Sequence, residues 1–253
     1  MRLSPAVRLL STLALPLALT ACGPTSTKSA APAAPSSAAP SSSAATTTAA
    51  PSPVATKAAG PNAGLLTGAQ LKALLAPASF FPSGFALDSA GSRDTGDTYV
   101  QPAAADVPTP DCTRLGGTSW TGITGITGVS FAQNDYVNKN TSAEIAQEID
   151  VYQGATAQTV IGALGKLALA CPSFADAQTS SKTKVTEAPL AGLGDEAYVI
   201  TVTDSAWQNG DTLIAARVGT SVVTVLANDG GDNGAATAKK LSGQLVSGLK
   251  AKA

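Results

Sequence analysis

The sequence predicts an α+β fold, in which helices cover an antiparallel β-sheet within a single domain that follows a disordered linker. Three observations indicate this. Residues 61–253 have the length of one domain and show no internal repeat. Their strand-like segments are joined by hairpin-length turns, and their helical segments stand apart from those hairpins. This separation is typical of α+β domains rather than of parallel sheets.

The first half of this domain is expected to hold one helix and two strands. Thr67 can cap a helix over residues 68–76. Residues 84–111, rich in glycine, aspartate and proline, predict an irregular loop. Alternating apolar residues predict strands over 128–134 and 143–153. A change of phase within the second strand predicts a bulge there or a later start.

The second half is expected to begin with a helix over 155–170, whose apolar face includes Leu169. Gly219 and Thr220 predict a tight hairpin turn between the last two of four strands. An amphipathic helix over 235–250 closes the domain. The four strands are expected over 182–188, 198–203, 212–218 and 221–227. The closing helix is expected to turn Leu241, Leu245, Val246 and Leu249 inward.

The beginning of the chain has the features of a secretory leader. Arg2 and Arg8 give the start of the chain a positive charge. The apolar run there is too short to span a bilayer, which needs about 20 residues. Residues 19–22, Leu-Thr-Ala-Cys, look like a bacterial lipobox, in which the cysteine thiol takes a diacylglyceryl group. We therefore expect residues 1–21 to be a lipoprotein signal peptide and Cys22 to anchor the protein to the extracytoplasmic face of the cell membrane. The alternative is a plain signal peptide with an incidental Cys22.

Residues 22–60 consist mainly of alanine, proline, serine and threonine and contain no aromatic residue. Such a segment buries too little apolar surface to offset its ordering entropy, so we expect a disordered, extended tether.

Composition excludes several functions. The chain carries a net charge of −1, and removing the two leader arginines lowers it to −3, which argues against a nucleic-acid partner. It has no histidine. This removes the commonest metal ligand and the Ser-His-Asp triad. We expect no metal, no cofactor and no enzymatic activity. Carboxylate or lysine chemistry stays open.

Cys112 and Cys171 remain once Cys22 is assigned to the lipid. An even pair of cysteines in an oxidising compartment predicts a disulfide. The alternative is a pair of reactive thiols.

Three groups of residues are candidates for a functional site. Asp195 and Glu196 are adjacent acids, but neighbours on a strand point in opposite directions, so we interpret them as a turn that begins a strand. Residues 228–234, Asn-Asp-Gly-Gly-Asp-Asn-Gly, suggest either a calcium loop or a turn with Asp232 or Asn233 as helix N-cap, and the missing terminal glutamate favours the turn.

Aromatic residues form the third group, because Trp120, Tyr136 and Trp207 are candidates to line a ligand cleft. The alternative is that they belong to the core. Trp207 lies in a predicted hairpin loop and is the best candidate for an exposed aromatic.

Several short motifs occur in the order found in one known family. Asp111-Cys112 precedes a tryptophan, a strand ends in Asp150-Val151-Tyr152, a helix ends in Cys171, and residues 193–197 read Leu-Gly-Asp-Glu-Ala before hairpin strands and a final helix. Together with the lipobox and linker, this order resembles the actinobacterial PknH-like extracellular sensor domain, which also occurs in free-standing lipoproteins. The resemblance implies a helix-covered antiparallel sheet with a cleft for an unidentified ligand. The receptor-kinase version has two disulfides, whereas this chain has cysteines for one.

We therefore expect a surface lipoprotein that binds or senses an unidentified small-molecule, lipid or cell-wall ligand. The alternative is a scaffold that recruits another exported protein. The hypothesis that the protein is a hydrolase is the least favoured.

Overall fold

The computed structural model describes residues 60–102, 110, 112, 115, 121–176 and 179–252. The leader, Cys22, nearly all of the linker and Trp120 lie outside these residues. Within the described part of the chain, no helix combines the length and apolar character needed to cross a membrane.

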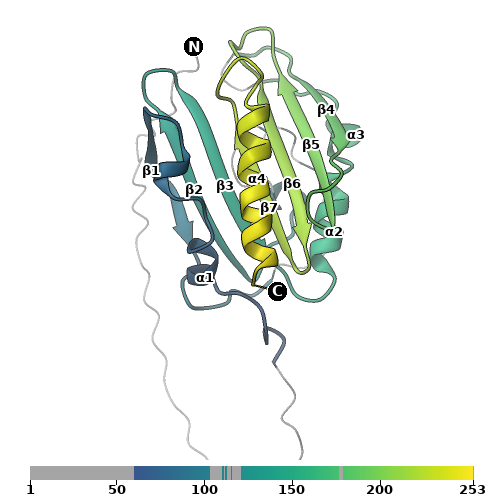
Figure 1. The fold of residues 1–253 in the computed structure, drawn as a ribbon. Helices are drawn as coiled ribbons and strands as arrows, with labels where there is room; N and C mark the ends of the chain where they lie inside the picture. Colours follow the sequence, from purple (N-terminus) through teal and green to yellow (C-terminus); the bar gives the residue numbers. More distant parts are fainter. Residues whose placement is uncertain are drawn as a thin grey trace, which may run out of the picture. The chain divides into compact units, whose positions relative to one another are not determined.

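Seven antiparallel strands form one sheet in the order β1-β2-β3-β7-β6-β5-β4, which confirms the α+β prediction (Figure 1). The strands are β1 (Phe85–Asp94), β2 (Ser130–Asn138), β3 (Ala143–Val151), β4 (Lys184–Pro189), β5 (Glu196–Thr203), β6 (Asp211–Val218) and β7 (Ser221–Ala227). Two meanders, β1–β3 and β4–β7, meet where β3 pairs with β7. The chain crosses between them through α2 (Thr156–Leu164) and α3 (Leu167–Ala170).

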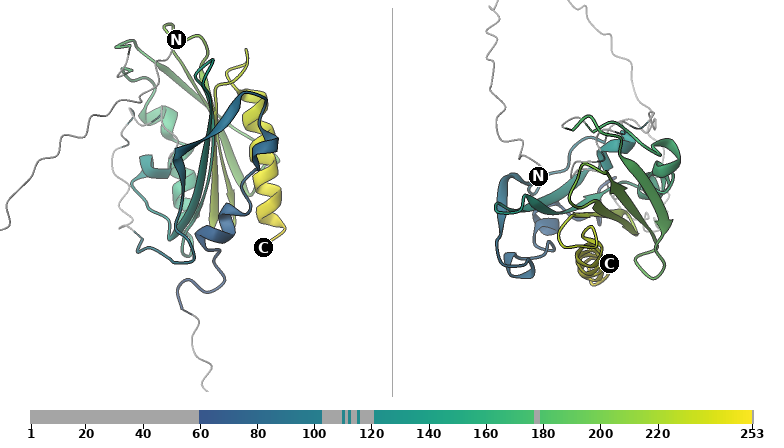
Figure 2. Two further views of the ribbon diagram at one scale, coloured as in Figure 1. Left: turned by 90° about the vertical axis from the view of Figure 1, so that its left-hand side faces the viewer. Right: turned by 90° about the horizontal axis from the view of Figure 1, so that it is seen from above.

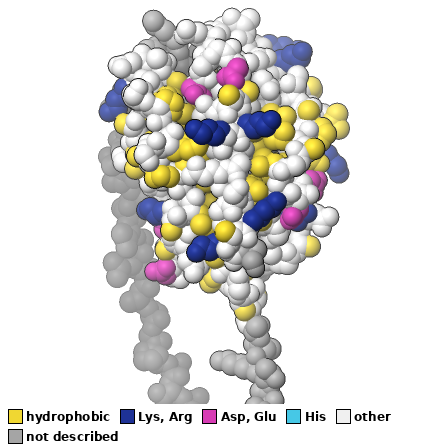
Figure 3. Space-filling view, in the orientation of Figure 1, with side chains coloured by type: hydrophobic (Ala, Val, Ile, Leu, Met, Phe, Trp, Pro, Cys, Tyr) yellow, Lys and Arg dark blue, Asp and Glu magenta, His cyan; other side chains and the backbone are white. Residues whose placement is uncertain are grey.

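Helices cover both faces of this sheet (Figure 2). The long α4 (Ala235–Lys250) and the short α1 (Gly68–Lys72) lie on one face, and α2 with the 3-10 helix Thr121–Thr124 lies on the other. Thr67 caps α1 as expected, because its hydroxyl accepts from Gln70 N while the Gln70 side chain accepts from Thr67 N. Figure 3 shows the α4 side, where lysine and arginine side chains are spread singly between apolar patches.

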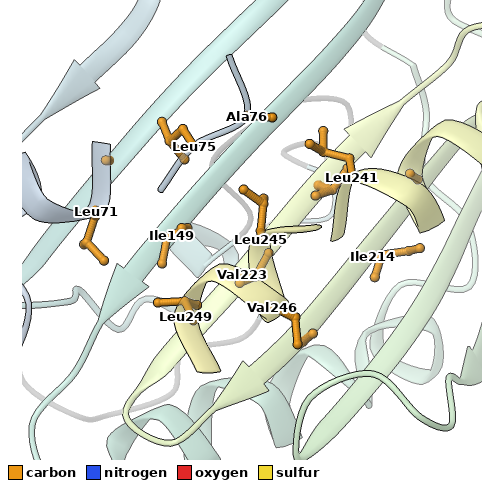
Figure 4. Close-up of a cluster of buried hydrophobic side chains, with 14 of the residues drawn as sticks. Leu71, Leu75, Ala76, Ile149, Ile214, Val223, Leu241, Leu245, Val246 and Leu249 are labelled. Atoms are coloured by element: carbon orange, nitrogen blue, oxygen red, sulfur yellow. The ribbon is translucent and has the colours of Figure 1, made fainter. Parts of the chain in front are cut away.

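Beneath α4, a buried apolar cluster joins the helix to the centre of the sheet (Figure 4). Leu241, Leu245, Val246 and Leu249 all face inward, as their helical spacing predicts. Leu71 and Leu75 bring α1 and the segment after it into the same cluster.

On the opposite face, a second buried cluster packs α2 against β5, β6 and β7. The Cys112–Cys171 disulfide is present and borders this cluster, with Cys171 fully buried at the end of α3. The bridge closes a separation of 59 residues, so it ties the segment before β2 to the crossover helices.

One strand was not expected from the sequence. Part of the presumed loop over 84–111 is the edge strand β1, which pairs with β2 on both sides of a bulge between Asp88 and Arg93. An edge strand has only one neighbour and buries little, so its residues need not alternate in polarity. Gly91, which suggested a loop, lies so close to Asp135 that a Cβ atom on it would be 2.6 Å from the Asp135 Cβ atom.

Two further expectations were wrong. The predicted helix over 155–170 is divided into α2 and α3, because the backbone leaves helical geometry at Lys166, which has a φ of −118° and a ψ of 5°. Leu169, assigned to the apolar face, is consequently 85% exposed. The predicted bulge in the strand over 143–153 is absent, since β3 pairs in unbroken register with both neighbours. Its phase change arises because both faces of a central strand are buried.

Candidate functional site

A cleft of about 890 Å³ lies at one end of the sheet, between the β2–β3 hairpin and the β5–β6 loop. Its lining residues come from segments within 82–85, 138–143, 206–209 and 228–230, with Thr179. The last of these segments connects β7 to α4 and lies between the two strand connections, because β7 and β6 occupy the middle of the strand order. The sheet topology therefore brings together four segments that are far apart in the sequence.

The cleft faces away from the point where the chain enters the domain. Near that entry, Gln153 Nε2 donates to Asn62 Oδ1 at 2.7 Å, just beyond the end of β3. Ala143, at the opposite end of β3, lines the cleft. A nine-residue strand is about 30 Å long. Figure 1 shows the β2–β3 hairpin and the β5–β6 loop at the end opposite α1 and the C-terminus of α4.

Asn228 holds the cleft floor together. Its Oδ1 accepts from Glu144 N at 2.6 Å, and its Nδ2 donates to Asp211 Oδ1 at 3.1 Å. This one amide therefore connects the ends of β3, β7 and β6. Because the carbonyl oxygen and the NH₂ group of this amide both form hydrogen bonds within the protein, Asn228 shapes the site and does not contact a ligand through its amide.

The connection from β7 to α4 is held by side-chain hydrogen bonds. Asn233 Oδ1 accepts from Gly210 N, and Asp229 Oδ2 accepts from Thr237 Oγ1, both at 2.7 Å. The helix N-cap is Gly234 rather than Asp232 or Asn233, because it has a φ of 78° and a Cβ atom there would be 2.3 Å from Ala227. Asp232 still accepts from a first-turn amide, Ala236 N, at 2.9 Å. The interpretation of this segment as a turn is correct, but the N-cap residue was assigned wrongly.

Asp204 fixes the β5–β6 loop that forms the opposite wall. Its two carboxylate oxygens accept from Ala206 N at 2.7 Å and from Ser181 Oγ at 2.6 Å. Trp207 follows in this loop, half-buried, where it packs against the cluster under α2 and lines the cleft. The loop thus presents an aromatic ring on a backbone that its own hydrogen bonds hold in place.

The three aromatic candidates lie in different places. Trp207 lines the cleft. Tyr136 does not, because it is 4% exposed and stacks on Phe81 with 3.7 Å between ring centroids. Burial raises the pKa of its phenol. Trp120 lies outside the described residues.

Asp195 and Glu196 serve the turn and strand, as interpreted from the sequence. Asp195 Oδ2 accepts from Gly219 N at 2.7 Å and pairs with Arg217 Nη1 at 3.0 Å, while Glu196 Oε1 accepts from the Tyr198 hydroxyl. The hydrogen bond to Glu196 is the main cause that raises the pKa of Tyr198. Among the described residues, no three His, Cys, Asp or Glu side chains lie together in a way that suits a metal ion.

Several polar residues of the cleft were not singled out from the sequence. Asn140, Ser142, Gln208 and Asn209 lie in turns, where such residues are ordinary. No local signal shows that the two turns face one cleft, since this follows from the strand order alone.

Comparison with known proteins found structural similarity. No family model matches the sequence, and no curated protein matches it. Among solved structures, the fold is similar to the extracellular domain of PknH from Mycobacterium tuberculosis, with a TM-score of 0.49 and 12% sequence identity. This alignment covers 74% of the present chain and 97% of that structure.

Proposed function

We propose that this protein is a lipid-anchored, extracytoplasmic binding or sensing module, and that its ligand occupies the cleft between the β2–β3 hairpin and the β5–β6 loop. The observation that carries the proposal is the cleft itself. Its floor is held by the Asn228 amide, its wall by Asp204, and its opening lies at the opposite end of the domain from the linker. A preorganised site loses little entropy on binding.

The chemistry of the lining favours binding over catalysis. Within the part of the chain that the structure describes, Asp229 is the one ionisable side chain of the lining. General acid–base hydrolysis needs two positioned groups, and a serine nucleophile needs a base beside it. The serines and threonines of the lining have no such neighbour within the lining. A non-enzymatic role therefore fits this site best.

The lipobox at Cys22 supports the anchored location. An anchor at Cys22 and a tether over 22–60 would hold the domain at the membrane while letting it reach into the cell envelope. Labelling cells with an alkyne fatty acid should mark the protein, and Cys22→Ser should abolish the label. Equal labelling of both forms would refute lipidation at Cys22.

Native mass spectrometry of residues 61–253, exported without Cys22, tests the ligand proposal. This part contains both buried clusters and the disulfide, so it has the core of an independent domain. We expect an added mass that is released on denaturation. Gln208→Ala should reduce the retained mass, whereas Gln158→Ala, an exposed glutamine on α2, should not.

A retained mass that is equal in both variants would place the ligand outside the cleft. Absence of any retained mass, together with one dominant protein partner in crosslinked cells, would favour the scaffold that recruits another exported protein.

A further inference from the structure

The cleft has a distinct electrostatic character. Among the described residues, no lysine or arginine lines it, and the one charged side chain of this lining is the carboxylate of Asp229. Lys139 lies at the tip of the β2–β3 hairpin but is not a lining residue. Phosphate, sulfate and carboxylate ligands are normally held by cationic or charge-assisted donors. An anionic ligand would find none in this lining and would face a negative charge.

Polar but neutral side chains stand on both walls. Asn140 lies on the β2–β3 hairpin, and Gln208 and Asn209 lie on the β5–β6 loop. Within the described part of the chain, the side-chain amides of these three residues make no hydrogen bond. Each amide carries a carbonyl acceptor and an NH₂ donor side by side. Neighbouring hydroxyl groups on a sugar ring present the same alternation of donor and acceptor.

An aromatic surface accompanies these amides. Trp207 lies in the same loop as Gln208 and Asn209, and the half-buried Phe85 lines the side of the cleft formed by β1 and β2. Aromatic rings bind apolar surfaces while leaving polar groups beside them in contact with water. The C–H face of a pyranose is such an apolar surface on an otherwise polar molecule. The volume of about 890 Å³ is near the upper end of small-molecule sites, about 300–1,000 Å³, and accommodates more than one ring.

We infer that the ligand is a neutral carbohydrate, held by stacking on Trp207 and by the amides of Gln208, Asn209 and Asn140. The inference rests on the proposed function, because it names the ligand class of the same cleft. The cleft lies about one strand length from the point where the chain enters the domain.

Isothermal titration of residues 23–253 with neutral oligosaccharides tests this inference. The probes are gluco-, manno-, galacto-, arabino- and N-acetylglucosamine tetramers, compared with inositol hexaphosphate as the anion and spermidine as the cation. We expect at least one neutral tetramer to bind with a Kd in the micromolar to millimolar range, and the anion not to bind. Trp207→Ala should weaken this binding at least tenfold, Gln208→Ala about threefold or more, and Gln158→Ala not at all.

Trp207→Phe keeps an aromatic face and should retain much of the affinity that Trp207→Ala loses, provided that thermal melts show both variants folded. No binding of any neutral tetramer overturns the carbohydrate inference. Cleft-dependent binding of spermidine, or of a peptide found by native mass spectrometry, overturns the ligand class but leaves the proposed binding function standing. Sugar binding that is unaffected by every cleft variant overturns both.

Discussion

Gln147 connects the segment after α1 to the centre of the sheet. It lies on β3 with its side chain in the face covered by α4, and it is 1% exposed. Its Oε1 accepts from Ala76 N at 2.8 Å, and its Nε2 donates to Ala76 O at 3.0 Å. Ala76 is itself 1% exposed, so one side chain satisfies both polar groups of a buried residue.

Gln147→Leu should lower the free energy of unfolding by about 2–5 kcal/mol. Leucine removes both hydrogen bonds and leaves the N–H and C=O of Ala76 buried, at a cost of about 1–3 kcal/mol each. Better burial of an apolar side chain offsets a small part of this loss. The predicted loss is a large fraction of the free energy of unfolding of a typical domain, which is about 5–15 kcal/mol.

Gln147→Glu provides a second, pH-dependent variant. A buried carboxylate keeps the acceptor but loses the donor, and burial raises its folded-state pKa above the unfolded value. Its protonated form donates to Ala76 O again. The deficit of this variant should therefore be greatest at neutral pH and shrink as the pH falls through that raised pKa.

Urea unfolding of residues 61–253 with the disulfide intact measures these changes. Gln244→Leu is the control, because Gln244 is exposed on α4 and the two residues have similar helix propensity. The control should remain within about 0.5 kcal/mol of the parent. If the stability of Gln147→Leu also stayed within about 0.5 kcal/mol of the parent, water would be forming hydrogen bonds with the N–H and C=O of Ala76. That result would refute the reasoning.

Three further predictions concern the disulfide, the cleft floor and one edge carboxylate. Replacing Cys112 and Cys171 by serine should cost about 4 kcal/mol in urea unfolding, from closure of a loop of 59 residues, and titration of the denatured, unreduced parent should find no free thiol from this pair. Asn228→Ala should cost about 2–4 kcal/mol by the same assay, because it breaks two hydrogen bonds and leaves buried polar groups without these partners. It should also weaken ligand retention, and an unchanged stability would show that the floor is held otherwise. Desolvation raises the pKa of Glu187 above its ordinary value, despite hydrogen bonds from Ala168 and Leu167. The folded state therefore binds the proton of the Glu187 carboxyl group more tightly than the unfolded state does, and ionisation at pH 7 destabilises the fold. Glu187→Gln should raise the melting temperature at pH 7. This gain should disappear below the ordinary pKa of glutamate. A gain in melting temperature that does not change with pH would contradict desolvation of Glu187 as the cause.

Local patterns were sufficient wherever the element carries its own periodicity or chemistry. The closing helix has the residues 235–250 expected for it, because an apolar stripe at helical spacing needs no knowledge of its partner. The turn at Gly219 and the strands on either side follow from hairpin chemistry. The disulfide follows from counting cysteines in a chain that the leader predicts to be exported.

Tertiary structure decided the rest. β1 has no strand pattern of its own and exists through pairing with β2. Gly165, between α2 and α3, packs against the Tyr198 ring from a distant strand, a contact that no local pattern reveals. The cleft depends on strand order, which places the β2–β3 hairpin and the β5–β6 loop at the same end of the sheet, although they are more than sixty residues apart in the sequence. Local sequence specifies which segments are strands and turns. Which turns face each other is settled only when β3 and β7 pair, because that pairing joins residues distant in the chain.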